Sequence, residues 1–274
     1  MFTSMLDFLF LGTSAATPTK SRNLSSLAIR RQNKANFWLI DCGEATQHRI
    51  LFSSLSLARI NCIFITHLHG DHLFGLAGLI ASRSLQGAQN PLKIFGPQGL
   101  KEYINVSLKT SSCRPLYPLE IIELNQKGAS WKQEGWEIKA IPLEHGVTCF
   151  AYSFTEEKIA APFLFEKAQK LKIPSGPLWG ELQRGSRISL EDGRQFEGKD
   201  FLGETRQKLK FIVAGDNYTP SLLEEDLKDA NLLIHEATYT DDVYKNLGKK
   251  QLHSTAKKLA KSVAFTGLKN LILT

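Results

Sequence analysis

Short apolar runs, each bounded by turn-forming or charged residues, recur along the chain. Runs of this length and composition predict buried strands. They lie at residues 6–13, 25–30, 37–43, 59–72, 91–97, 119–124, 136–146, 149–154, 208–216, 230–238 and 269–274. Apolar residues with helical spacing predict helices at residues 44–55 and 73–85. This alternation of strands with helical or turn segments predicts an α/β fold with buried strands.

Residues 156–204 interrupt that pattern. The stretch KIPSGPLWGELQRGSRISLEDGRQFEGKD is rich in glycine, proline and charge and has few apolar runs. We interpret residues 156–204 as a flexible arm inserted within a single domain that spans residues 1–274, rather than as a linker between two domains.

Composition narrows the class of protein. Hydrophobic residues make up 42% and charged residues 22% of the 274 residues, as is ordinary for a soluble globular protein. The formal net charge of +7 favours an anionic partner such as nucleic acid, although a basic protein need not bind one. The apolar start of the chain is short and contains Asp7, so it predicts a strand and not a signal peptide. We find no apolar run long enough for a membrane span. The four scattered cysteines lack a CxxC motif and predict reduced thiols in a cytoplasmic protein.

The segment ITHLHGDHLFG at residues 65–75 holds three of the seven histidines and an aspartate. Alternate side chains of an extended segment point the same way, so His67 and His69 project together from the end of a strand. Asp71 and His72 follow at the start of a predicted helix, where aspartate is a favourable cap. Imidazole and carboxylate together suit zinc or another first-row divalent ion. HxHxDH between a strand and a helix therefore predicts a metal site.

Two further ligand candidates follow other predicted strands, at positions where loops converge on a site. These are His145 in IPLEHG and Asp216 in FIVAGD. Either residue alone would more often be structural. Together with the cluster at residues 67–72 they complete a set that could hold two metal ions, with Asp216 as a bridging carboxylate.

At this point the chain resembles the metallo-β-lactamase superfamily, which is marked by HxHxDH plus a distant His, Asp and final His. It resembles more closely the branch of ribonuclease Z, also called RNase BN, which processes the 3′ ends of tRNA. The PxKxRN loop of that branch corresponds to PTKSRN at residues 18–23, and its HEAT and HST segments correspond to residues 235–238 and 253–255. FLGTSAATP, DCGEATQ and GPLWGELQRG match the same branch. The resemblance covers essentially all 274 residues.

The resemblance implies an αβ/βα sandwich of two mixed sheets flanked by helices, with a protruding exosite arm. It implies a zinc-dependent endoribonuclease that removes 3′ trailers from precursor tRNA and leaves a 3′-hydroxyl, working as a homodimer. One zinc site would use His67, His69, His145 and Asp216, and the other Asp71, His72 and the shared Asp216. Asp71 would be the general base, and His253 would be the general acid, oriented by Glu236. His235 and His48 receive no ligand role.

The resemblance also suggests where substrate binds. Lys20, Arg22 and Asn23 lie in the PTKSRN loop, which in the family helps to distinguish trailer-bearing precursors from mature CCA ends. Five basic residues of the arm suit phosphate contacts with the tRNA elbow: Lys167, Lys170, Lys172, Arg184 and Arg187. A second basic stretch near His253 is either a contact surface or a solvated helix face: Lys245, Lys249, Lys250, Lys257, Lys258 and Lys261.

One departure concerns the end of the sequence. The family places its last metal-binding histidine after a strand such as LILT and then continues, whereas the sequence stops at Thr274. The expectation is therefore a C-terminally truncated form whose second zinc site is weak or empty. Three functions are alternatives to tRNA processing: a phosphodiesterase of the same fold, a 3′ exoribonuclease acting on other RNA, and a catalytically impaired tRNA-binding form.

Overall fold

The computed structural model describes residues 6–31, 34–157, 161–205, 207–247 and 252–274. The chain folds into two compact units. The main unit contains Ser4–Thr155 and Leu209–Thr274, and the arm unit contains Glu156–Lys208. Within the described residues, no helix is both long and apolar enough to cross a membrane.

The main unit contains two six-stranded sheets. The first has the order β1-β2-β3-β4-β5-β6, antiparallel from β1 to β3 and parallel from β3 to β6. Its strands are β1 (Leu6–Gly12), β2 (Ser26–Arg31), β3 (Phe37–Ile40), β4 (Ile60–Phe64), β5 (Leu92–Pro97) and β6 (Leu119–Leu124). Both pairing directions occur, so this sheet is mixed.

The second sheet has the order β14-β13-β12-β9-β8-β7. β12, β13 and β14 run parallel, while β9 pairs antiparallel with β12 and β7 antiparallel with β8. Its strands are β7 (Ala129–Gln133), β8 (Trp136–Leu143), β9 (Cys149–Glu156), β12 (Lys210–Ala214), β13 (Leu232–His235) and β14 (Asn270–Leu273). The sequence pattern did not predict β7, whose residues are mostly half-exposed.

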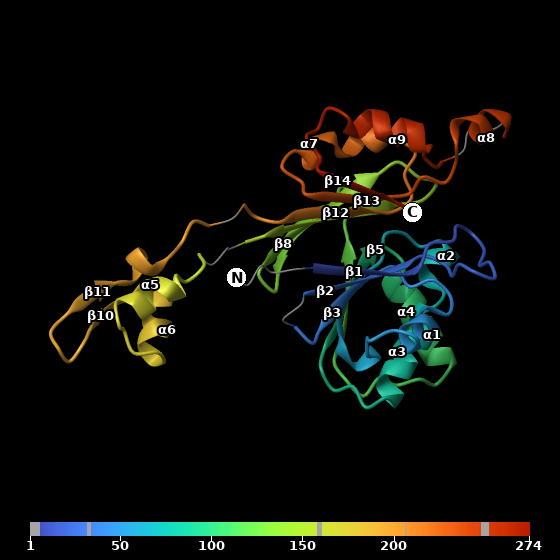
Figure 1. Cartoon of the computed structure of the whole chain (residues 1–274). Helices are drawn as coiled ribbons and strands as arrows, with labels where there is room; N and C mark the ends of the chain where they lie inside the picture. The colour runs from blue at the N-terminus through green and yellow to red at the C-terminus, as the bar shows by residue number, and fades with distance from the viewer. Residues whose placement is uncertain (1–5, 32–33, 158–160, 206, 248–251) are drawn as a thin grey trace. The chain divides into compact units, whose positions relative to one another are not determined.

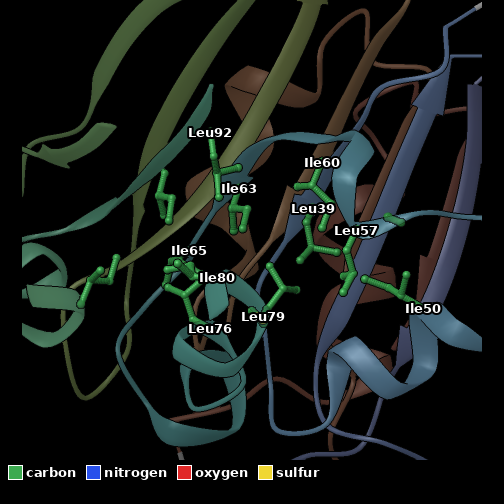
Figure 2. Packing of buried hydrophobic residues seen from close by; sticks show 14 of the residues in the cluster. Leu39, Ile50, Leu57, Ile60, Ile63, Ile65, Leu76, Leu79, Ile80 and Leu92 are labelled. Atoms are coloured by element: carbon green, nitrogen blue, oxygen red, sulfur yellow. The ribbon is translucent and has the colours of Figure 1, made fainter. Parts of the chain in front are cut away.

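Alternation along the strands divides the core into layers. Trp38 and Phe64 belong to an aromatic-rich cluster that includes residues of both sheets. Leu39 and Ile63 point to the opposite face of the first sheet and pack in a second, aliphatic cluster (Figure 2). Because neighbouring residues of a strand face opposite sides, short strands of continuous apolar residues can serve both clusters at once.

Helices cover the outer faces of the sandwich (Figure 1). Residues of three helices pack in the aliphatic cluster on the first sheet: α1 (Thr46–Leu51), α3 (Leu76–Leu85) and α4 (Leu100–Thr110). Leu227 and Leu259 pack against Ile212 and Leu233 of the second sheet, from α7 (Glu224–Leu227) and α9 (Ala256–Val263). Shorter elements are α2 (Gly70–Leu73), α8 (Asp241–Asn246), η1 (Leu57–Arg59) and η3 (Pro220–Leu223). Two mixed sheets between helical layers form the predicted αβ/βα sandwich.

The arm unit has secondary structure and a small core of its own. Its elements are α5 (Phe165–Lys170), α6 (Pro177–Gln183), β10 (Arg187–Ser189), β11 (Gln195–Glu197) and η2 (Gly198–Phe201). β10 and β11 form a two-stranded antiparallel sheet. The buried core consists of Phe163, Ala168, Ile173, Leu182, Ile188 and Phe201. These apolar residues are spread singly through a polar stretch, so the sequence shows few apolar runs. The fold brings them together into one core.

Candidate metal centre and active site

The candidate ligands lie where strands of the main unit end. β4 leads to His67 and His69, β8 to His145 and β12 to Asp216. Gly215 permits this approach, since a Cβ there would lie 2.6 Å from Cβ of Thr66 and 2.7 Å from Sγ of Cys149. The glycine therefore brings the end of β12 close enough to β4 for Asp216 to face the histidines.

The first group of ligands comprises His67, His69, His145 and Asp216. One donor atom from each of these side chains lies within 4.8 Å of all the others. Oδ2 of Asp216 is 3.8 Å from Nε2 of His67 and 3.8 Å from Nε2 of His145. Three imidazoles and one carboxylate are a common donor set for a first-row divalent metal.

The second group comprises Asp71, His72 and the other oxygen of Asp216. Nε2 of His72 lies 3.5 Å from Oδ1 of Asp216 and 3.6 Å from Oδ2 of Asp71. Asp216 therefore directs one carboxylate oxygen toward each group, which is the arrangement a bridging carboxylate requires.

Hydrogen bonds fix which nitrogen of His67 and of His145 can bind a metal. Nδ1 of His145 donates to the carbonyl of Leu252 at 2.9 Å. Nδ1 of His67 lies 3.0 Å from the Thr66 hydroxyl, which gives its own proton to Asp41, so the histidine is the donor. Nε2 of His67 is buried and has no hydrogen-bond partner among the described residues. Outer partners that hold Nδ1–H in this way leave Nε2 with a lone pair for a metal.

The electrostatics also suit a cation. Burial, followed by the neighbouring histidines, lowers the pKa of His67 far below its usual range and keeps the ring neutral. Burial would lower the pKa of His72 as well, but Asp41, Asp216 and Asp71 outweigh it and raise that pKa to about 9. Burial raises the pKa of Asp216, against the opposing effect of His72 and His253. Clustered carboxylates and a buried unpartnered imidazole nitrogen fit a divalent metal ion.

Asp41 is a site residue that the sequence reasoning missed. Its backbone has φ of 57°, in the left-handed region that aspartate tolerates better than most residues. Its carboxylate accepts hydrogen bonds from the amide of Thr66 at 2.8 Å, from the Thr66 hydroxyl at 2.9 Å and from Nδ1 of His72 at 2.7 Å. Asp41 follows β3, so the signal that pointed to Asp216, an acidic residue directly after a buried strand, was also present here.

Glu236 and His253 lie together at the edge of this centre. Nδ1 of His253 is 3.4 Å from Oε1 of Glu236 and 3.6 Å from Oδ2 of Asp216. The contact with Glu236 raises the pKa of His253, and burial opposes that effect. Burial of Glu236 itself would raise its pKa, but His253 and hydrogen bonds from Thr238 and Ser254 lower it. The pair thus consists of a carboxylate and an imidazole that holds its proton more tightly than usual.

Glu236 also joins two loops, a role the sequence did not suggest. Its Oε1 accepts hydrogen bonds from the amides of Asn217 at 3.2 Å and Ser254 at 2.8 Å. These amides directly follow Asp216 and His253. One buried carboxylate therefore fixes the loops that carry Asp216 and His253 relative to each other. The neighbouring His235 uses both ring nitrogens, one with the Glu236 carbonyl and one with Asn217.

The PTKSRN loop starts beside the centre. The amide of Ala16 donates to Oδ2 of Asp71 at 2.8 Å, which joins the N-terminal loop to a candidate ligand. Lys20 and Arg22 are exposed. The side-chain amide of Asn23 donates to the carbonyl of Glu44 at 2.8 Å, so Asn23 stabilises the loop.

The structure describes only part of the second basic stretch. Lys249 and Lys250 lie outside the described residues. The ammonium of Lys257 is 3.7 Å from Oδ2 of Asp241. The ammonium of Lys258 donates to the carbonyl of Tyr218 and lies 3.5 Å from the centroid of that ring.

Comparison with known proteins decides the family. Curated ribonuclease Z sequences from two Bacillus species are similar over nearly the whole chain. One from Bacillus cereus is 40% identical over 270 residues, covering 98% of this chain and 88% of its own. One from Bacillus thuringiensis is 39% identical with the same coverage. The chain belongs to the ribonuclease Z family. A family model described as Anti-Pycsar protein Apyc1 also matches residues 6–157.

Solved structures agree with this assignment. The short form of human tRNase Z is 27% identical, with a TM-score of 0.72, and the match covers 98% of this chain and 92% of the human one. The metallo-β-lactamase fold protein YhfI from Bacillus subtilis is 16% identical with a TM-score of 0.65, covering 98% of this chain and 85% of its own, and supports the fold alone. The expected metallo-β-lactamase fold is confirmed, and this member of the ribonuclease Z family is a metal-dependent hydrolase.

Proposed function

We propose that this chain is a zinc-dependent endoribonuclease that removes 3′ trailers from precursor tRNA and leaves a 3′-hydroxyl on the tRNA. The observation that carries the proposal is the position of Asp216. It faces two ligand groups with its two oxygens and lies 3.6 Å from the acid candidate His253. Phosphodiester cleavage needs these parts side by side: metal ligands, a base and an acid.

The proposed metal is zinc, two ions per subunit. His67, His69, His145 and Asp216 would hold one ion, and Asp71, His72 and Asp216 the other. When bound, the two ions supply a hydroxide near neutral pH and stabilise negative charge on the phosphoryl oxygens. The first group contributes four ligands and the second three among the described residues, so we propose that the first binds metal more tightly.

The chain's own residues handle the protons. Asp71 is proposed to accept a proton from the attacking water. His253 is proposed to donate a proton to the leaving 3′-oxygen, because its contact with Glu236 favours the protonated imidazole. Glu236 keeps that ring oriented, and Asp41 does the same for His72.

Substrate contacts outside the centre are proposed in two places. Lys20 and Arg22 would contact the 3′ end of the substrate from the exposed loop that follows Ala16, whose amide donates to Asp71. The arm unit would act as an exosite for the tRNA body. Lys170, Lys172, Arg184 and Arg187 are exposed there and suit sequence-independent phosphate contacts.

We further propose a cytoplasmic homodimer. The four cysteines are free thiols, in keeping with a reducing compartment. Four apolar side chains on and beside the helices of the first sheet are strongly exposed: Leu51, Phe52, Phe74 and Leu85. We propose that these side chains contribute to the contact between subunits. Light scattering coupled to gel filtration measures the oligomeric state, and a monomer at micromolar concentration would contradict the dimer.

The central experiment uses the zinc-loaded protein and a precursor tRNA with a defined 3′ trailer. We expect one cut after the tRNA body, with a 3′-hydroxyl on the upstream product, as judged by end-group analysis. Bis(p-nitrophenyl) phosphate serves as a small comparison substrate. Hydrolysis of the small diester without cleavage of the precursor would favour a phosphodiesterase with another substrate.

A further inference from the structure

A small cavity lies directly beside His253, on the side of α8 and α9. Its volume is about 230 Å³, and its walls include Tyr218, Tyr244, Lys245 and Lys258 as well as His253. Cavities for drug-sized ligands usually measure about 300–1,000 Å³, so this one has room for a single ring system. The cavity takes no part in holding the metal ligands described above.

The walls carry two tyrosines, two lysines and one carboxylate, Asp241, which accepts a hydrogen bond from Thr255 of the same walls. Lys258 covers the ring of Tyr218 and donates to the carbonyl of the same residue, so this lysine and tyrosine form one fixed wall. The walls also include Tyr244 of α8, whose ring centroid is 6.1 Å from that of Tyr239. Tyr239 in turn contacts His253 edge-on at 6.2 Å. An aromatic row therefore leads from the acid candidate into the cavity.

Two contacts fix α8, and with it Tyr244, against the neighbouring α9. The hydroxyl of Thr255, the N-cap residue of α9, donates to Asp241 at the start of α8. The amide of Ala256 donates to the carbonyl of Tyr239 at 3.1 Å. These two contacts therefore hold the start of α8 against the start of α9.

A tyrosine wall with ammonium groups beside it matches a nucleotide. Nucleobases stack on aromatic side chains, and lysines contact the phosphates of the backbone. Given the proposed function, on which this step rests, the position of His253 identifies the nucleotide that the cavity would bind. His253 protonates the 3′-oxygen that leaves, so the sugar bearing that oxygen lies next to it. The base of the same sugar is then within reach of the cavity.

We propose that this cavity binds the base of the nucleotide on the 5′ side of the cleaved bond, the last nucleotide of the tRNA body, by stacking on Tyr244. The site recognises any base, because stacking on an aromatic face does not read hydrogen-bonding groups. Tyr244 is thereby a specificity-determining residue: it favours substrates with an ordered base at that position and fixes the place of the cut.

The test compares two precursor tRNAs with the zinc-loaded wild-type protein, one intact and one that lacks only the base of that nucleotide. We expect a KM about tenfold higher for the abasic precursor with the wild-type protein. Tyr244→Phe retains the ring and should keep this ratio. Tyr244→Ala should reduce the ratio to about one, because it raises KM for the intact precursor alone. Val243→Ala, which changes a half-exposed side chain on the same helix outside the cavity, is the matched control.

Equal KM values for the two precursors in the wild-type protein would overturn the proposal, as would an unchanged ratio in Tyr244→Ala. A wild-type protein that cleaves no precursor tRNA would instead refute the proposed function. In that case, inhibition of bis(p-nitrophenyl) phosphate hydrolysis decides the matter. Adenosine 3′-monophosphate should inhibit the wild-type protein about tenfold better than inorganic phosphate does, and Tyr244→Ala should remove that difference. Equal inhibition by the two compounds in the wild-type protein would rule out a base-binding cavity.

Discussion

The carboxylate of Asp41 lies 2.7 Å from Nδ1 of His72, two residues that are 31 positions apart in the sequence. The same carboxylate binds the amide and hydroxyl of Thr66, directly before His67. One side chain therefore supports a ligand candidate of each group, and it sets the orientation of both imidazoles without belonging to either ligand set.

This relationship predicts the effect of Asp41→Asn. The amide keeps the shape of the side chain but loses the charge that favours His72 in its present orientation. We expect a 10- to 100-fold loss, roughly, in metal affinity or in kcat, measured by zinc titration and by precursor cleavage. Asp229→Asn is the matched control, because Asp229 also has a left-handed backbone, with φ of 66°, but is exposed. Equal effects of the two substitutions would show that Asp41 has no special role.

A second prediction concerns Asp71. Asp71→Ala removes both a ligand candidate and the proposed base, and we expect it to lower kcat for precursor cleavage by at least about 100-fold. The exposed Asp242 of α8 provides a control, since Asp242→Ala should cleave like the wild type. If Asp71→Ala kept substantial activity with its metal still bound, Asp71 would have no place in the mechanism.

Metal removal should destabilise the main unit. A ligand present at about 100 times its dissociation constant stabilises the folded state by about 2.7 kcal/mol. For a chain of this size we therefore expect EDTA to lower the thermal midpoint by about 5 to 10 °C, measured by calorimetry. In His67→Ala the same treatment should have little effect. A drop of similar size in that variant would mean that His67 does not bind the metal.

The two ends of the arm unit lie close together, so the arm unit can be deleted without disturbing the main unit. The amide of Gly203 donates to the carbonyl of Pro162 at 2.8 Å, and Phe163 pairs with Leu202. Replacing residues 163–202 with a Gly-Ser link therefore spans a short distance. We expect KM for precursor tRNA to rise at least about tenfold, with little change in hydrolysis of bis(p-nitrophenyl) phosphate.

A gentler variant tests the charges of the arm alone. Lys170→Ala combined with Arg184→Ala removes two exposed positive charges outside the arm's small core. We expect weaker precursor binding and a shallower dependence of that binding on salt. For the deletion of residues 163–202, equal losses of activity on the precursor and on the small diester would point to a damaged main unit. The exosite proposal would then fail.

The cysteines should differ sharply in reactivity. Burial raises the pKa of Cys62 to about 12, and burial likewise raises the pKa values of Cys42 and Cys149. Since the thiolate is the reactive form, these three thiols should resist alkylation at pH 8. Only Cys113, which is half-buried, should react with N-ethylmaleimide in the native protein. Mass spectrometry should detect one adduct before denaturation and four after it; rapid modification of Cys149 would contradict the packing beside Gly215.

The sequence by itself determined the class of the fold and most of the candidate centre. Strands that serve two core clusters must be apolar throughout, so runs such as FWLI in β3 were visible without any structure. Four of the six ligand candidates were equally visible, because a strand followed by HxHxDH carries its chemistry within a few residues. The family resemblance rested on such local motifs as well.

Tertiary structure decided what depends on residues distant in sequence. Asp41 supports His72 only because separate strand ends meet in the fold. The same holds for Glu236, which accepts hydrogen bonds from Asn217 and Ser254. The core of the arm unit gathers single apolar residues, such as Phe163 and Ile188, that form no run. A local pattern records burial and periodicity along one element, whereas these contacts are set by the packing of several elements, and no short stretch of sequence contains them.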